Sequence, residues 1–236
     1  ENSTLQAAGN LNFNKNGSSV IYNLGSSSIT ASGNVSIESG VTVNANTSNW
    51  TVGGSWTNSG TFTADTSTVT FNSGSTGKTI YSGGSSFYNI IFNNASGGWT
   101  LQEAMTVTND FTVTNSDTTG SGVDLNGKAV NVTNDFSING GEVTAGASTI
   151  TIGGNWTNSG TFTYDTSTVI LTGASVALDT GGNATTKRFY NLQITTAGQT
   201  VTLTNQLAIQ NVLTIGSTSG SKVTLTGSSY SLYLYK

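Results

Sequence analysis

Apolar and polar residues alternate along most of the chain. In short segments such as Val35–Ile37 and Val41–Val43, apolar residues occupy positions i and i+2, with Ser or Thr between them. This period of two is the signature of a half-buried β-strand, and the Gly-, Ser- and Asn-rich runs between the segments are typical of turns. No stretch carries the 3.6-residue apolar period of an amphipathic helix. The pattern therefore predicts an all-β protein.

A long repeat organises these segments. Thr51–Phe71 returns as Thr151–Leu171 with most positions identical, and polar turns that lead into a strand recur about 20–25 residues apart, as in solenoid repeats. Three short strands fit into each such interval, which is the geometry of one coil of a parallel β-helix. We therefore expect a single elongated β-solenoid of about ten coils over residues 1–236. Two internal copies of a long repeat are expected at about 34–133 and 134–236.

The alternative fold is a tandem pair of antiparallel β-sandwiches, since short strands with frequent turn signals are typical of that fold too. The β-helix is favoured because most loops are variable Ser/Gly-rich segments rather than two-residue hairpin turns. Pro is absent, which leaves the backbone N–H groups available for pairing between coils. The residues expected inside are Trp50, Val52, Phe62, Val69, Phe71, Phe111, Val113, Phe136, Ile138, Ile150, Ile152, Phe162, Val169 and Leu171.

Charge and composition exclude several classes of function. Only 8% of residues are charged, the net charge is −4, and the 7 basic residues are scattered, which argues against binding of nucleic acid. No apolar run is long enough for a membrane span. Cys and His are absent, which removes thiolate chemistry, Cys-bound zinc and the commonest general base. We therefore expect no enzyme activity, cofactor or metal, and we interpret Asp65 and Asp165 as Asx-turn residues.

The aromatic residues divide into core and surface candidates. Trp56 and Trp156 recur beside Gly turns and are interpreted as stacked core aromatics. Trp99 aligns near the polar Gln199 of the second copy, so we expect it to face outward. In Ser231–Tyr235, the alternation predicts Leu232 and Leu234 inward and Tyr233 and Tyr235 outward. Trp99, Tyr233 and Tyr235 are thus the predicted surface aromatics for a sugar face or a partner protein.

The two ends of a β-helix are open coils whose unpaired backbone groups template another strand. Leu11 and Phe13 lie in the first predicted strand, and Leu232 and Leu234 in the last. These residues are the predicted assembly ends. The expected partners are other copies stacked end to end, or adjoining solenoid coils.

Three sequence features resemble the repeats of a known class of proteins. The segment Gly54–Phe62 reads Gly-Ser-Trp-Thr-Asn-Ser-Gly-Thr-Phe, and Ser67–Phe71 and Phe87–Phe92 follow it. Over most of Ser32–Gly227 the pattern is similar to large secreted bacterial β-helix surface proteins, the haemagglutinin-like and autotransporter-type adhesins. The resemblance implies an extracellular stalk or adhesive role and brings no catalytic residue with it.

The expected function is therefore a non-enzymatic extracellular structural or adhesive protein of the cell surface, a subunit or segment of a fibre, stalk or sheath, with surface glycans as candidate ligands. One alternative is an ice-binding β-solenoid, because Thr-X-Thr triplets such as Thr61–Thr63 are frequent. Their spacing is irregular, and Thr also suits the outer face of any strand. The other alternative is a carbohydrate-binding or polysaccharide-degrading β-helix.

Overall fold

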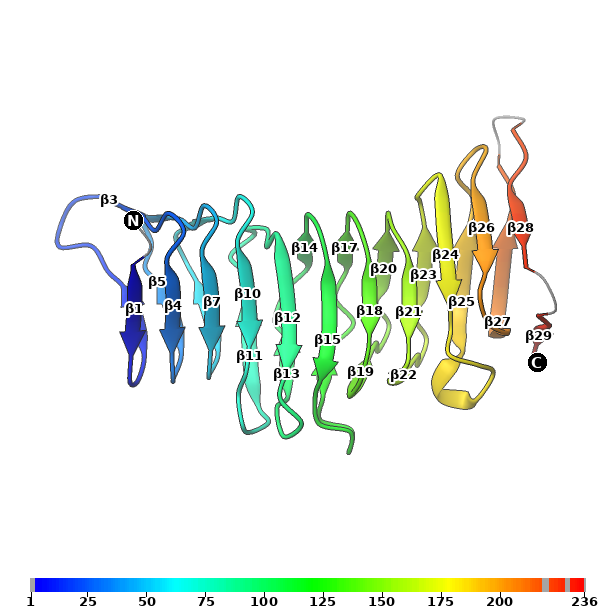
Figure 1. Ribbon diagram of the computed structural model, residues 1–236, viewed down its shortest axis with the longest axis horizontal. Coiled ribbons are helices and arrows are strands. Elements are labelled where there is room, and N and C mark those ends of the chain that lie inside the picture. The colour runs from blue at the N-terminus through cyan, green and yellow to red at the C-terminus, as the bar shows by residue number, and fades with distance from the viewer. Residues whose placement is uncertain (1–2, 218–220, 228–229, 236) are drawn as a thin grey trace.

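The protein is a parallel β-solenoid of about eleven turns. The computed structural model describes residues 3–217, 221–227 and 230–235. Its coils follow one another along the long axis of the molecule, from β1 to β29 (Figure 1). At about 4.8 Å per coil, eleven coils span roughly 50 Å. The prediction of an all-β parallel β-helix is confirmed, with one coil more than expected. The antiparallel β-sandwich alternative is wrong, because the strands pair in parallel with strands of the neighbouring coils.

Three faces make up the solenoid. Sheet A, with eleven strands, consists of β1 (Thr4–Ala7), β4 (Ser28–Ala31), β7 (Asn49–Val52), β10 (Thr68–Phe71), β12 (Asn89–Asn93), β15 (Phe111–Asn115), β18 (Phe136–Ile138), β21 (Trp156–Asn158), β24 (Ser175–Asp179), β26 (Thr200–Leu203) and β28 (Thr224–Thr226). Sheet B, with eight, consists of β2 (Leu11–Phe13), β5 (Val35–Ile37), β8 (Trp56–Asn58), β11 (Lys78–Tyr81), β13 (Trp99–Leu101), β16 (Val123–Asp124), β19 (Glu142–Thr144) and β22 (Thr161–Thr163).

The third face is divided between two sheets. Sheet C consists of β3 (Val20–Asn23), β6 (Val41–Asn44) and β9 (Thr61–Thr63). Sheet D consists of β14 (Met105–Val107), β17 (Val130–Val132), β20 (Thr149–Ile152), β23 (Thr168–Leu171), β25 (Phe189–Ile194), β27 (Leu207–Ile215) and β29 (Leu232–Leu234). A single bridge from Phe87 to Val107 marks the coil between them.

Pairing in register turns the alternation of the sequence into continuous core columns. Because aligned residues of parallel strands point to the same side of the sheet, each inward residue stacks on the inward residue of the next coil. One column in sheet A runs through Ile29, Trp50, Val69, Ile90, Phe111, Phe136 and Trp156. Every residue predicted for the core is buried. That part of the sequence prediction is confirmed.

Aromatic rings form the centre of this core. The rings of Phe111 and Phe136 lie 4.5 Å apart at an interplanar angle of 4°, and those of Phe136 and Trp156 lie 5.0 Å apart at 3°. Trp50 and Trp56 meet edge to face at 5.5 Å. The interpretation of Trp56 and Trp156 as core aromatics is confirmed, since both are buried.

The two copies of the long repeat occupy different faces of the solenoid. Trp56–Asn58 forms β8 of sheet B, whereas the matching Trp156–Asn158 forms β21 of sheet A. The strands that follow are displaced in the same way, because Thr61–Thr63 lies in sheet C and Thr161–Thr163 in sheet B. The same sequence therefore folds into the same strand–turn–strand unit rotated by one face.

Side-chain oxygens at the corners connect one coil to the next. The Asn34 side chain accepts a hydrogen bond from the Ser55 backbone N–H at 2.8 Å, and the Asp135 side chain accepts one from the Asn155 N–H at 2.7 Å. Asp165, which has a positive φ of 44°, accepts from the Gly146 N–H at 2.9 Å. Asp65, with a φ of 47°, accepts from the Asn46 side chain at 3.2 Å. Both Asp residues therefore lie in the turn before a strand, as predicted, but their side chains accept hydrogen bonds from the preceding coil, which corrects their interpretation as Asx-turn caps.

The cross-section changes near the C-terminal end. Sheet B ends at β22, while sheets A and D continue. In the next coil a short 3₁₀ helix, η1 (Thr185–Lys187), lies against β22 in the place where a sheet B strand would follow. Because η1 replaces a strand there, the surface beside β22 has a step where sheet B stops.

Candidate functional site

Trp99 is a core residue, so its prediction as a surface aromatic is wrong. The side chain is 1% exposed, and its ring lies 5.2 Å from Phe92. The comparison with Gln199 was misleading because Gln199 is itself buried, with its amide donating a hydrogen bond to the Leu171 carbonyl at 2.9 Å. A polar residue in the second copy therefore did not mark an outward position.

The last described strand, β29, combines core and surface features. Leu232 and Leu234 pair with the buried Leu207 and Ile209, so they continue the core columns as the alternation predicts. Both remain exposed, at 44% and 64%, because no further strand pairs with β29 among the described residues. An apolar surface therefore lies at this end of the coil stack.

Tyr233 and Tyr235 lie on the other side of β29 and are half-buried. Their rings stack at 6.4 Å, and the Arg188 guanidinium lies 3.7 Å from the centre of the Tyr235 ring, which is a cation–π geometry. Both tyrosines are thus partly engaged by their own chain. Their role in binding stays a prediction.

At the opposite end, the first described coil is covered in part. Phe13, predicted as an assembly residue, is 3% exposed because Tyr22 packs on it at 5.1 Å, and Leu11 is half-buried. Phe13 is therefore not part of an exposed end. Leu5 of β1 is exposed at 39%, and Ile21 of β3 in the same coil is exposed at 63%. Leu5 was not among the predicted assembly residues, although the alternation of Thr4–Ala7 indicates it.

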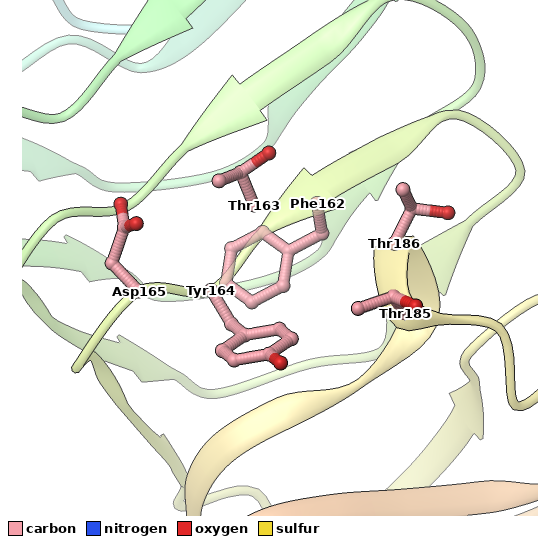
Figure 2. Close-up of a pocket in the computed structure, with 6 residues that line it drawn as sticks. All are labelled: Phe162, Thr163, Tyr164, Asp165, Thr185 and Thr186. Atoms are coloured by element: carbon pink, nitrogen blue, oxygen red, sulfur yellow. The ribbon is translucent and has the colours of Figure 1, made fainter.

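A pocket of about 270 Å³ opens at the step where sheet B ends. Phe162, Thr163, Tyr164 and Asp165 line it from β22 and the turn that follows, and Thr185 and Thr186 line it from η1. Figure 2 shows the Phe162 and Tyr164 rings on one side of the hollow and the two η1 threonines opposite. This pocket was not predicted from the sequence. The available signal was Tyr164 itself, which stands where the first copy has Ala64.

Hydrogen bonds to the buried Asn158 hold η1 in place. The Asn158 side-chain amide donates to the Thr186 carbonyl at 3.2 Å, and Lys187 Nζ donates to the Asn158 carbonyl at 3.1 Å and to the Gly160 carbonyl. Desolvation lowers the pKa of Lys187, and attraction to Asp179 partly opposes this. Lys187 therefore bonds η1 to the turn between β21 and β22.

Outward tyrosines continue from the pocket over the next coils. The rings of Tyr164 and Tyr190 stack at 6.4 Å with an interplanar angle of 20°. The Tyr164 hydroxyl donates to the Gln210 side-chain oxygen at 3.4 Å, and Arg188 donates to the same oxygen at 3.2 Å. These contacts join the pocket to Arg188 and Tyr235. We call Tyr164, Tyr190, Arg188, Gln210 and Tyr235 the tyrosine strip.

The buried and half-buried carboxylates are bonded to their own chain. Glu142 is 7% exposed, and its two oxygens accept from the Gly120 N–H and the Thr163 hydroxyl, each at 2.9 Å. Desolvation raises the pKa of Glu103, but hydrogen bonds from the Ser82 hydroxyl and from backbone N–H groups, Gly84 first, outweigh it and lower the pKa. Both carboxylates stabilise loops between coils.

Sheet A carries a regular column of outward threonines. Thr30, Thr51 and Thr70 pair in register on β4, β7 and β10, and Thr112 and Thr157 occupy the same column further along. Ile91 and Ser137 occupy the remaining coils of that stretch. Parallel pairing thus aligns threonines that look irregularly spaced in the sequence, although Ile91 and Ser137 interrupt the column.

Among the described residues, no three His, Cys, Asp or Glu side chains gather in a group that would hold a metal ion. None of their helices is long and apolar enough to cross a lipid bilayer. Comparisons with protein-family models, with curated proteins and with solved structures found no match to this chain.

Proposed function

We propose that this chain is a non-enzymatic structural and adhesive segment of an extracellular surface fibre, stalk or sheath, in which copies associate end to end. One observation carries the proposal. The two edges of sheet A are strands of the same pattern, Thr4-Leu5-Gln6 in β1 and Thr224-Leu225-Thr226 in β28. Each edge presents a leucine in a core column between outward polar residues.

The edges of sheet A are suited to each other. An unpaired strand edge templates a further strand, and matching alternation places the apolar residues of both partners on the same side. Pairing of β28 with β1 of another copy would bury Leu5 and Leu225. It would also bring a further coil over the exposed Leu232 and Leu234. Because this contact joins two different surfaces and stacks the copies along one axis, it repeats without closing into a ring and produces an open filament.

Composition and resemblance support the location. The chain has few charges, no Cys and no His, and its repeats resemble those of haemagglutinin-like and autotransporter-type surface proteins. A rod with continuous columns of apolar side chains, and with hydrogen bonds between coils at its corners, is suited to a structural role. Its outer faces are then available for adhesion.

Substitution of Leu234 by Asp tests end-to-end association. Wild-type chain is expected to associate as its concentration rises, and L234D to weaken association by about tenfold or more, because the contact would bury an unpaired charge. V212D is the matched control, since Val212 is 48% exposed but lies on the side of the rod, in β27. Sedimentation velocity over a concentration series measures all three chains. A wild type that stays monomeric throughout, or a V212D chain as defective as L234D, contradicts the proposal.

The threonine column of sheet A favours ice binding as a second candidate function. Hydroxyl and methyl groups that repeat at about 4.8 Å on a flat face are able to order water in a lattice. If this function holds, the protein lowers the freezing point of a solution without changing its melting point. Replacing Thr51 and Thr70 by Lys would abolish the difference between the melting and freezing points. A wild type without measurable thermal hysteresis excludes the candidate.

A further inference from the structure

The pocket beside β22 differs from its counterpart in the first copy in two ways. Tyr164 replaces Ala64, and η1 covers the next coil. In the first copy the buried Asn58 donates instead to the Ser82 carbonyl and the Ser85 hydroxyl. A unit that otherwise repeats almost unchanged has thus acquired an aromatic wall and a polar rim at this one place.

The chemistry of the pocket is amphipathic. Tyr164 offers a ring face, while the exposed Thr185, Thr186 and Asp165 offer hydroxyl and carboxylate oxygens across the opening (Figure 2). A pyranose ring has the complementary arrangement, with C–H groups on its faces and hydroxyl groups at its edge. Apolar packing on the tyrosine and hydrogen bonds to the rim would satisfy both parts of such a ligand.

The charge around the pocket selects against anionic ligands. Asp165 is the charged residue that lines it. Two cations lie nearby, and both are already engaged. Lys187 Nζ donates to the Asn158 and Gly160 carbonyls. The Arg188 guanidinium lies 3.7 Å from the Tyr235 ring centre and donates to the Gln210 side chain at 3.2 Å and to the Asn183 carbonyl at 3.3 Å. A carboxylated or sulfated sugar would meet a carboxylate without a free cation to pair with.

The size and surroundings indicate how much of a glycan would fit. A volume of about 270 Å³ lies just below the range of about 300–1,000 Å³ typical of pockets for drug-sized ligands, which suits a single sugar ring. Tyr190 continues the ring surface on the next coil and would contact the neighbouring sugar.

We infer that the Tyr164 pocket and the tyrosine strip bind a neutral glycan, with one hexopyranose ring seated against Tyr164 between η1 and Asp165. This inference rests on the adhesive part of the proposed function and names its ligand class. It does not depend on end-to-end association.

Binding to defined probes tests the inference. The probes are neutral hexasaccharides of glucose, galactose, mannose and N-acetylglucosamine, with a hexasaccharide of galacturonic acid as the anionic probe. Isothermal titration or saturation-transfer NMR is expected to detect at least one neutral probe and no binding of the anionic one. Binding of no neutral probe, or preference for the anionic probe, overturns the inference.

Three variants locate the site. Y164A, which restores the residue of the first copy, should weaken binding by about tenfold or more, as expected when a central aromatic anchor is removed. T185W fills the pocket from an exposed position and should block binding even if Y164A does not fold. Y81A is the control, because Tyr81 is exposed on β11 of sheet B, away from the pocket. If Y164A or T185W binds as tightly as wild type, or Y81A loses binding as they do, the pocket is not the site.

The outcomes for glycan and filament are separable. If filaments form but no glycan binds, only the glycan-binding inference is wrong. If the chain binds a glycan but stays monomeric, the adhesive role is supported and the proposed end-to-end assembly is wrong.

Discussion

Replacing Phe136 by Asp is expected to lower the free energy of unfolding by about 4 kcal/mol or more. The Phe136 side chain is fully buried, with its ring stacked between Phe111 at 4.5 Å and Trp156 at 5.0 Å. The substitution removes both contacts and places a carboxylate where no described cation or donor reaches it. Urea unfolding followed by circular dichroism and tryptophan fluorescence measures the loss.

The neighbouring residue on the same strand provides the control. Ser137 points outward from β18 and pairs with Thr112 and Thr157 on the outer face. S137D should change stability by no more than about 0.5–1 kcal/mol, since its charge remains in water. If S137D costs as much as F136D, the assignment of inward and outward positions in β18 is wrong.

Replacing Gly154 by Ala is expected to cost about 1–3 kcal/mol, as in other cases of overpacking. A Cβ at this position would lie 2.7 Å from the Asn134 carbonyl oxygen and against the Asp135 side-chain oxygen. That Asp135 oxygen accepts the Asn155 N–H at 2.7 Å, so the added methyl group would displace the hydrogen bond between coils.

G74A is the control for this prediction, because a Cβ at Gly74 would meet no atom within 4 Å. Thermal unfolding of the two variants compares them directly. Equal melting temperatures for G154A and G74A would show that the close approach at the corner does not limit stability.

The sequence predicted the fold and the core because both depend on alternation. Positions i and i+2 of each segment, together with the repeat, determine which side chains point inward once strands pair in parallel. It could not predict the rotation of the second copy by one face. Trp50 pairs with Val69 and Phe111 with Phe136, so a coil takes from 19 to 25 residues. Because the loops vary in length, the sequence does not determine on which of the three faces a later segment lies.

The candidate site was harder to predict because it arises from exceptions to the pattern. Tyr164 becomes the wall of a pocket only because η1 takes the place of a sheet B strand, and residues 181–187 carry no alternation that would place them there. Trp99 was misplaced because Gln199, its counterpart, satisfies its amide inside the protein. Internal comparison identifies equivalent positions but not their hydrogen-bond partners.

Electron cryomicroscopy of wild-type chain at associating concentrations shows whether copies stack end to end. End-to-end stacking predicts single-file filaments with strands perpendicular to the filament axis and a subunit repeat of roughly 50 Å. In these filaments, β28 of one copy pairs with β1 of the next, so that sheet A runs on without a break. Separate rods at every concentration, or assemblies in which rods pack side by side while β1 and β28 stay unpaired, would contradict it.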